Sequence, residues 1–393
     1  MKRIIEGSRA IAETIRACKP GVVSAYPITP QTHIVEELAQ MKADGEADFE
    51  YVRAESEFAA ASIVEGASAT GVRVYTATSS QGLLLMTEVI YNIAGMRLPV
   101  VLTDANRAVS APINIWNDCQ DVMVVRDAGW LMWFGETNQE VCDLHILAYK
   151  VAEQLMLPVM VNLDGYILTH VIEPVEIEDE KKVAKFLPPY NPREKLDVNN
   201  PLTMGALATP DYYFEIRKDL HDDVVASLKT MKKEMKKFKE IFGRKLDLVE
   251  YYGDKNADTV LVAMGSVIGT MKDAADEINH KSTKTGKHKN KPSSAKASAG
   301  KIGILKIVSF RPFPDEEIIK ALAKAKNIAV IDKSISLGTE GILATEMRRV
   351  LGDKKKIVSY VLGLGGRDIT KEMINKVFFN IKKIKDKLVF VSK

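Results

Sequence analysis

The feature that most constrains this 393-residue chain is a regular alternation of short apolar runs with amphipathic segments over residues 7–165. The apolar runs are β-branched and bounded by Gly or Pro, as strands are, and they cover residues 22–26, 49–52, 72–78, 99–104 and 158–163. Between them, apolar side chains recur at helical spacing in residues 8–17, 32–41, 57–69, 83–94 and 139–154. Strands that alternate with helices predict a parallel sheet with right-handed crossovers.

A second, smaller alternation starts at residue 259. Strand-like runs at 302–308, 328–332 and 357–361 alternate there with helical patterns at 316–325, 341–351 and 371–378. We therefore expect an α/β protein with two doubly wound, mostly parallel-sheet domains, residues 1–185 and 256–393.

The stretch between the two alternations, residues 186–255, is expected to be a connector. It opens with the proline-rich residues 187–192, which cannot continue a helix. Apolar side chains then recur at steps of four and three from Val224 to Phe242, with lysines on the opposite face. This amphipathic helix either packs on its own chain as a linker or forms a subunit contact.

Residues 281–301 interrupt the second alternation with a Lys- and Ser-rich segment that has no large apolar side chain. Such a segment cannot offset the entropy of ordering itself, so we expect a disordered insertion that is peripheral to the chemistry. Its lysines have no aromatic companions, which disfavours single-stranded nucleic acid as a ligand.

Charge and cysteine content exclude several functional classes. The net charge of +3 is small for this length, and no uncharged apolar run approaches a membrane span. We expect a soluble, cytoplasmic protein that binds neither nucleic acid nor membrane. The three cysteines, Cys18, Cys119 and Cys142, are too scattered to hold a metal or an iron–sulfur cluster, so such chemistry is expected on a partner.

Four loops that follow predicted strands combine hydroxyl, amide and proline residues with few charges: residues 25–32, 54–58, 78–82 and 106–112. In an open parallel sheet such loops lie at the carboxyl ends of the strands, where ligands bind. Two acids, Glu55 and Glu57, and one arginine stand there among otherwise neutral residues. This pattern predicts a site for a polar organic cofactor and a small anion.

Glu57 is the first candidate for chemistry, because it opens an Ala- and Ser-rich helix directly after a predicted strand. Small neighbouring side chains let a bulky ligand approach, and a carboxylate in such a place can share a proton with a ring nitrogen. An acid at a helix N-terminus is also favourable simply through the helix dipole. Glu55 competes for the same role two residues earlier.

Arg107 and Thr29 are the candidates for binding the anion. Arg107 is followed by an apolar loop with no acid until Asp118, so it is available for a substrate carboxylate, although a long-range ion pair is an equally ordinary role. Thr29 stands between Pro27 and Pro30, which hold its hydroxyl in place, and it can equally be a simple turn residue.

Other catalytic patterns are missing from the sequence. There is no G-x-S-x-G motif, no P-loop and no full G-x-G-x-x-G motif, which disfavours hydrolases, kinases and nicotinamide dehydrogenases. His33, His145 and His170 stand apart without metal-ligand spacing, and His145 is expected to be a packed helix residue.

Taken together, the loops resemble the α subunit of the 2-oxoacid:ferredoxin oxidoreductases, most closely the pyruvate type. The resemblance continues through residues 115–118, 126–130, 138–140, 205–208 and 311–314. Each motif alone is weak evidence for this family, but several of them in the same order and at the same spacing are specific to it. The resemblance implies a first domain that binds the aminopyrimidine of thiamine diphosphate and a second domain like the transketolase C-terminal domain.

The resemblance also implies roles for single residues. Glu57 corresponds to the catalytic glutamate that hydrogen-bonds the aminopyrimidine, and Thr29 and Arg107 correspond to the pair that holds the 2-oxoacid. Further cofactor contacts are expected from the loops after the first and third predicted strands, at Pro27, Ile28, Ser80 and Gln81. No metal ligand is expected on this chain.

The implied reaction is the oxidative decarboxylation of pyruvate with coenzyme A to acetyl-CoA, CO₂ and reduced ferredoxin. The implied partners are a β subunit that binds the diphosphate, Mg²⁺ and a cluster, ferredoxin-like γ and δ subunits with further iron–sulfur clusters, and ferredoxin. Two alternatives remain open. The substrate can be a branched-chain 2-oxoacid or 2-oxoglutarate, with residues 110–114 and Trp116 setting its size, or the chain can be a non-catalytic assembly subunit.

Overall fold

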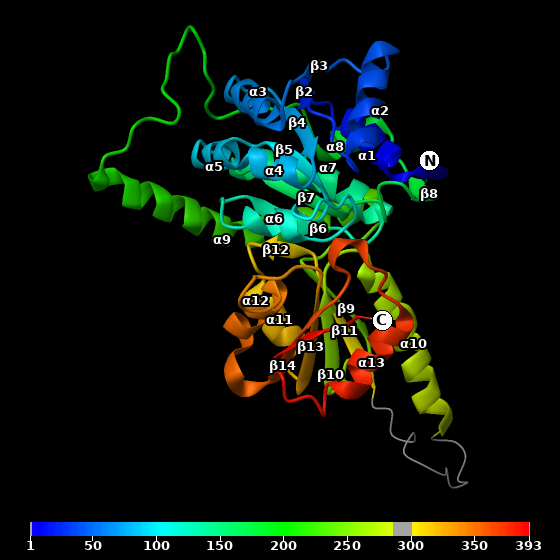
Figure 1. Cartoon of the computed structure of the whole chain (residues 1–393). Helices are drawn as coiled ribbons and strands as arrows, with labels where there is room; N and C mark the ends of the chain where they lie inside the picture. The colour runs from blue at the N-terminus through cyan, green and yellow to red at the C-terminus, as the bar shows by residue number, and fades with distance from the viewer. Residues whose placement is uncertain (1, 286–300, 393) are drawn as a thin grey trace. The chain divides into compact units, whose positions relative to one another are not determined.

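The computed structural model describes residues 2–285 and 301–392 (Figure 1). By its contacts the chain separates into two compact units. The first comprises Met1–Asp247 with Ser309–Phe313, and the second comprises Leu248–Val308 with Pro314–Lys393.

The first unit is built on a seven-stranded sheet. Its spatial order is β12 (Ser309–Arg311), β6 (Leu131–Phe134), β7 (Val159–Asp164), β5 (Val101–Asn106), β4 (Val74–Thr78), β2 (Val22–Ala25) and β3 (Glu50–Arg53). Every neighbouring pair is parallel except the edge pair β12–β6. The predicted parallel α/β sheet is therefore confirmed, with β6 and the antiparallel edge strand as additions.

Helices cover both faces of this sheet. They are α1 (Gly7–Ala17), α2 (Thr32–Ala43), α3 (Glu57–Ala69), α4 (Gln81–Leu85), α5 (Thr87–Gly95), α6 (Gln120–Val124), α7 (Asn138–Leu155) and α8 (Glu180–Phe186). Helices α3–α6 gather on one face, and α1, α2 and α7 gather on the other (Figure 1). This grouping follows from right-handed crossovers, because the chain steps outward from β2 in both directions along the sheet.

Two local features differ from the sequence-based expectation. The helix predicted over residues 83–94 is divided into α4 and α5 at Met86, where the Thr87 hydroxyl donates to Leu84 O at 2.6 Å. The unpredicted strand β1 (Lys2–Glu6) pairs antiparallel with β8 (Ile172–Glu176), which joins two segments far apart in sequence.

The connector contains α9 (Pro210–Phe242), a 33-residue helix that starts well before the predicted apolar stripe. Its carboxyl-terminal half packs on α7 and α8 of the same unit. The Phe238 ring lies 5.6 Å from the Phe186 ring and 4.3 Å from the Phe242 ring, between ring centres. The amino-terminal half instead exposes Tyr212 and Phe214.

The second unit has a six-stranded sheet in the order β15 (Leu388–Phe390), β14 (Lys356–Val361), β13 (Asn327–Asp332), β10 (Thr259–Ala263), β11 (Ile302–Ile307) and β9 (Val249–Gly253). All its pairs are parallel except β11–β9. Its helices are α10 (Val267–Thr285), α11 (Asp315–Ala321), α12 (Ile342–Leu351) and α13 (Lys371–Asn380), with short 3₁₀ turns η1 (Gly352–Lys354) and η2 (Leu364–Gly366).

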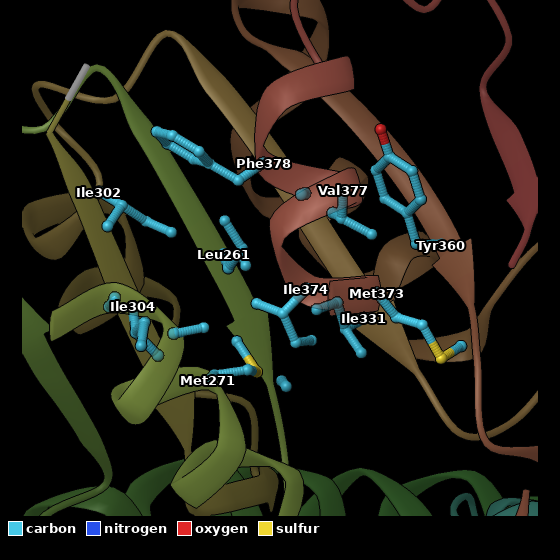
Figure 2. Close-up of a cluster of buried hydrophobic side chains, with 14 of the residues drawn as sticks. Leu261, Met271, Ile302, Ile304, Ile331, Tyr360, Met373, Ile374, Val377 and Phe378 are labelled. Carbon is cyan, nitrogen blue, oxygen red and sulfur yellow. The ribbon is translucent and has the colours of Figure 1, made fainter. Parts of the chain in front are cut away.

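A continuous apolar core holds α10 and α13 against this second sheet (Figure 2). Met271 from α10 and Ile374 and Phe378 from α13 lie over the strand residues Leu261 and Ile304. All five side chains are buried, so this face of the sheet is closed by packing alone.

The Lys- and Ser-rich segment begins inside a helix. Helix α10 continues to Thr285, so residues 281–285 are helical and differ from the disordered insertion expected there, while 286–300 lie outside the described residues. Elongation of a helix that is already packed costs little per residue, which explains the extension. Within the described parts of the chain, no helix is both long enough and apolar enough to cross a membrane.

Gly341 provides a test of packing in the second unit. A Cβ at this position would lie 2.3 Å from Oδ2 of the fully buried Asp332, so Gly341→Ala should destabilise the unit by about 1–3 kcal/mol through overpacking. In α10, Gly269 has nothing within 4 Å of its Cβ position, so the control Gly269→Ala should stabilise by about 0.5–1 kcal/mol. Urea denaturation measures the free energy of unfolding of both variants. Changes of the same sign in the two variants would contradict the tight packing at Gly341.

Candidate active site

The carboxyl ends of the central strands meet at one edge of the first sheet. The parallel ladders place Ala25 opposite Arg53 and Thr78 opposite Asp104. The loops after β2, β3, β4 and β5 therefore share this edge, as the sequence predicts. One direct link is the Ser79 hydroxyl, which donates to Ala105 O at 2.8 Å.

Glu57 is the first residue of α3 and is 7% exposed, whereas its competitor Glu55 is exposed. A Cβ on Gly82 would lie 2.7 Å from Glu57 Oε1, so the carboxylate lies directly against the backbone at the start of α4. In the part of the chain that the structure describes, no side chain or backbone group donates a hydrogen bond to this carboxylate, and no cation pairs with it. The carboxylate is therefore open to a ligand.

Two further polar atoms at the start of α4 lack partners within the described residues. Thr78 Oγ1 and Gln81 Nε2 are buried without a hydrogen bond, although buried polar groups are nearly always paired. The Thr78 hydroxyl would lie 2.4 Å from a Cβ on Gly82, so it adjoins the same backbone as the Glu57 carboxylate. Together the three groups offer a carboxylate, a hydroxyl and an amide donor, which suits a flat polar ring with both donor and acceptor atoms.

Ser80 forms the turn between β4 and α4 with an unusual backbone conformation. Its φ of 48° and ψ of −121° are sparsely populated for a residue with a side chain, and such strain gathers at functional sites. The hydroxyl donates to Ala108 O at 2.6 Å, which links the turn to the loop after β5. Ser80 is fully buried, while Gln81 is half-buried.

The structure brings Arg107 and Thr29 together. Arg107 Nη1 donates to Thr29 O at 2.9 Å, and Nε donates to Asn114 O at 2.9 Å. Burial lowers the pKa of the guanidinium, which is 6% exposed as a residue and pairs with no carboxylate among the described residues. A buried cation held only by carbonyl oxygens favours an anionic ligand.

The loop after β2 is anchored by Gln31, which the sequence reasoning did not single out. Its side-chain amide donates to Ala77 O at 2.7 Å and accepts from Ile28 N at 3.1 Å. This fully buried side chain fixes the loop against β4, with Ile28 half-buried and Pro27 exposed. The only sequence signal was its place within the Pro-flanked loop.

Asp121 is the second residue that sequence reasoning missed. It lies in the short helix α6, is fully buried, and accepts hydrogen bonds from Arg107 N at 2.8 Å and Ser80 N at 3.0 Å. Burial raises its pKa to about 7. No motif could have revealed it, because it follows no predicted strand.

His145 and the cysteines Cys18 and Cys142 are packed residues. His145 Nε2 lies 2.6 Å from the Thr103 hydroxyl, and burial lowers the pKa of this histidine to about 4, as expected for a core residue. Burial raises the pKa of Cys18 and Cys142 to about 12, so these thiols are poor nucleophiles. Within residues 2–285 and 301–392, no group of three or more His, Cys, Asp or Glu side chains could hold a metal ion.

Family models match most of the chain. Residues 13–237 match the thiamine diphosphate-binding domain of pyruvate flavodoxin/ferredoxin oxidoreductase, and residues 287–374 match core domain II of pyruvate:ferredoxin oxidoreductase. The first match contains Thr29, Glu57 and Arg107.

Full-length relatives agree with these matches. The pyruvate synthase subunit PorA of Methanosarcina barkeri is 47% identical over 97% of this chain and 92% of its own length. PorA of Methanocaldococcus jannaschii is also 47% identical, over 98% and 96%. The ketoisovalerate oxidoreductase subunit VorA of Pyrococcus horikoshii is 40% identical over 98% and 94%.

Two solved structures share the fold. A 2-oxoglutarate:ferredoxin oxidoreductase from Magnetococcus marinus superposes with a TM-score of 0.71 at 19% identity over 97% of this chain. The match spans 65% of that longer chain. A split-gene transketolase gives a TM-score of 0.56 at 11% identity, over 98% of this chain and all of its own. These likenesses confirm the predicted fold class.

The resemblance inferred from the strand-end loops is thus confirmed by the family models and by the full-length relatives: the chain belongs to the pyruvate:ferredoxin oxidoreductase family.

Proposed function

We propose that this chain is the α-type subunit of a pyruvate:ferredoxin oxidoreductase and contributes the aminopyrimidine and oxoacid side of a thiamine diphosphate site. The observation that carries this proposal is a pair of buried charges on one sheet edge, Glu57 and Arg107, neither of which forms a salt bridge within the described residues. Burying a charge without a partner costs free energy. A ligand that pairs with both charges is therefore the simplest explanation for their presence.

The residues around Glu57 fit the aminopyrimidine of thiamine diphosphate. When bound, this cofactor supplies a nucleophilic carbon and an electron sink for cleaving the bond between a carbonyl and a carboxylate. Glu57 would hold a proton at a ring nitrogen, and the unpaired Gln81 Nε2 and Thr78 hydroxyl would contact the polar edge of the ring. Pro27, Ile28 and Ser80 would form the walls on either side.

Arg107 and Thr29 would hold the 2-oxoacid. The guanidinium keeps Nη2 for the substrate carboxylate, because its Nε and Nη1 groups already donate to Asn114 O and Thr29 O. This arrangement fixes the orientation of the cation before the substrate binds, which reduces the entropic cost of binding. The Thr29 hydroxyl would donate to the substrate carbonyl.

Pyruvate is the proposed substrate, since the relatives with 47% identity are named pyruvate synthase subunits. The loop that would limit substrate size contains the exposed Ile113 and Trp116. Branched-chain 2-oxoacids and 2-oxoglutarate are the alternatives, and a ketoisovalerate oxidoreductase subunit is 40% identical. A non-catalytic assembly role is disfavoured because all three proposed site residues are present and two of their charges are buried.

Partner subunits would supply the rest of the centre. A β subunit would bind the diphosphate, its Mg²⁺ and an iron–sulfur cluster, and ferredoxin-like γ and δ subunits would carry electrons to ferredoxin. Coenzyme A would accept the acetyl group, and the setting would be the cytoplasm. Three buried, separate cysteines on this chain support placing the clusters on partners.

Substrate profiling of the reconstituted complex tests the proposal directly. With coenzyme A and ferredoxin present, kcat/KM for pyruvate should exceed that for 2-oxoisovalerate and 2-oxoglutarate by at least about tenfold, since a mismatch of a few methylenes costs about 1–3 kcal/mol. Higher kcat/KM for either larger acid would reassign the substrate, and no turnover of any of them would remove the catalytic role.

Glu57→Gln should lower kcat by about 100-fold or more, because a glutamine cannot exchange a proton with the ring nitrogen. The melting temperature and subunit assembly should remain unchanged, since the carboxylate has no partner to lose. Glu55→Gln, at the exposed competitor, serves as the matched control and should retain wild-type turnover. Pyruvate-dependent ferredoxin reduction measures both variants, and a fully active Glu57→Gln complex would contradict the assignment.

Arg107→Ala should raise KM for pyruvate by about 10- to 100-fold, because a charge-assisted hydrogen bond contributes about 1.5–3 kcal/mol. Arg97 provides a control, since its guanidinium already forms an ion pair with Asp223. Arg97→Ala should leave KM unchanged. Steady-state kinetics over a range of pyruvate concentrations measure KM for both variants. An unchanged KM in Arg107→Ala would remove Arg107 from the substrate site.

A further inference from the structure

Asp121 lies at the meeting point of two loops that the proposed function uses separately. Its Oδ2 atom accepts from Ser80 N in the turn after β4 (3.0 Å) and from Arg107 N in the loop after β5 (2.8 Å). Its Oδ1 atom accepts from Val122 N at 2.8 Å and adjoins the Asn106 amide at 3.4 Å. One carboxylate oxygen is therefore shared by the backbone of both loops.

Burial disfavours the charged form of this carboxylate. Burial raises the pKa of Asp121 to about 7. The pKa of Asp104, which is also buried, is raised by burial and by the charge of Asp121. Because the folded protein holds these protons more tightly than the unfolded chain, whose Asp residues titrate near pH 4, this contribution to stability falls as the pH rises from about 4 to 7. A carboxylate kept at such a cost requires another explanation.

The two hydrogen bonds reach groups whose positions matter for the site. Ser80 holds a sparsely populated backbone conformation, and its hydroxyl donates to Ala108 O, next to Arg107. At the other end of Arg107, the guanidinium is held by the carbonyls of Thr29 and Asn114. Asp121 thus fixes the backbone of Arg107, while the carbonyls of Thr29 and Asn114 fix its charged end.

We propose that Asp121 is a positioning residue that holds the Ser80 turn and Arg107 at a fixed separation. This fixed separation would set the position of the oxoacid relative to the cofactor. This proposal rests on the proposed function, because it assumes that Arg107 binds the oxoacid. Asp121 itself touches neither ligand. Its loss would shift the arginine and the turn together.

Asp121→Asn in the assembled complex tests the proposal. An amide offers one oxygen and one NH₂ group, so either Ser80 and Arg107 or Val122 and Asn106 lose their acceptor. KM for pyruvate should rise about tenfold while the melting temperature at pH 8 stays the same or rises. The control Asp143→Asn removes another buried carboxylate, one that is ion-paired with Arg244 at 2.7 Å. Asp143 lies in α7 and contacts neither the Ser80 turn nor Arg107, so this variant should leave KM unchanged.

A double-mutant cycle with Arg107→Ala separates this inference from the proposed function. If Asp121 acts through Arg107, Asp121→Asn should add little to KM once Arg107 is alanine. An unchanged KM in Arg107→Ala alone would refute the role of Arg107. If Arg107→Ala raises KM but Asp121→Asn leaves it normal, only the positioning role is overturned. The same holds if the two substitutions raise KM independently, so that their effects multiply in the double variant.

Hydrogen exchange of the wild-type complex provides a measurement that needs neither turnover nor a variant. Oxamate, an unreactive carboxylate analogue of pyruvate, should slow amide exchange at Arg107 and also at Ser80, because both amides donate to the same oxygen of Asp121. Slower exchange at Arg107 without any change at Ser80 would overturn the positioning role of Asp121. This measurement tests the proposal even if the Asp121→Asn complex does not assemble.

Discussion

The parallel pairing of β2, β4 and β5 is the constraint on which the rest of the first unit depends. Parallel strands end on the same side, so every loop that follows a central strand is delivered to one edge. The three strands are almost wholly buried, and β4 and β5 have no exposed residue at all. Their packing supplies the rigidity that a site built on loops would otherwise lack.

That rigid edge carries several buried polar groups. Arg107 and Asp121 are held by hydrogen bonds, whereas the Glu57 carboxylate, Thr78 Oγ1 and Gln81 Nε2 have no partner within the described residues. Each would cost about 1–3 kcal/mol or more if nothing satisfied it. Glu57, Thr78 and Gln81 belong to two neighbouring loops of this edge, and Gly82 allows the backbone to approach the Glu57 carboxylate closely.

Much of this was predictable from local patterns. Strand and helix periodicity located the central strands of both sheets, and the motif order pointed to Glu57, Thr29 and Arg107. Patterns failed where tertiary contacts override propensity. The antiparallel edge strands β9 and β12 pair only because the fold brings them to a sheet edge, and the division between α4 and α5 at Met86 has no local sequence signal.

The sequence by itself determined the α/β class, the family and the identity of the loops, because periodicity and motif spacing are written along the chain. Only the tertiary structure showed that Glu57 is buried while Glu55 is exposed, joined Thr29 to Arg107, and revealed Gln31 and Asp121 as the side chains that tie loops together. The physical reason is that burial and long-range hydrogen bonds arise from strand pairing. No residue carries a local signal for a partner dozens of positions away.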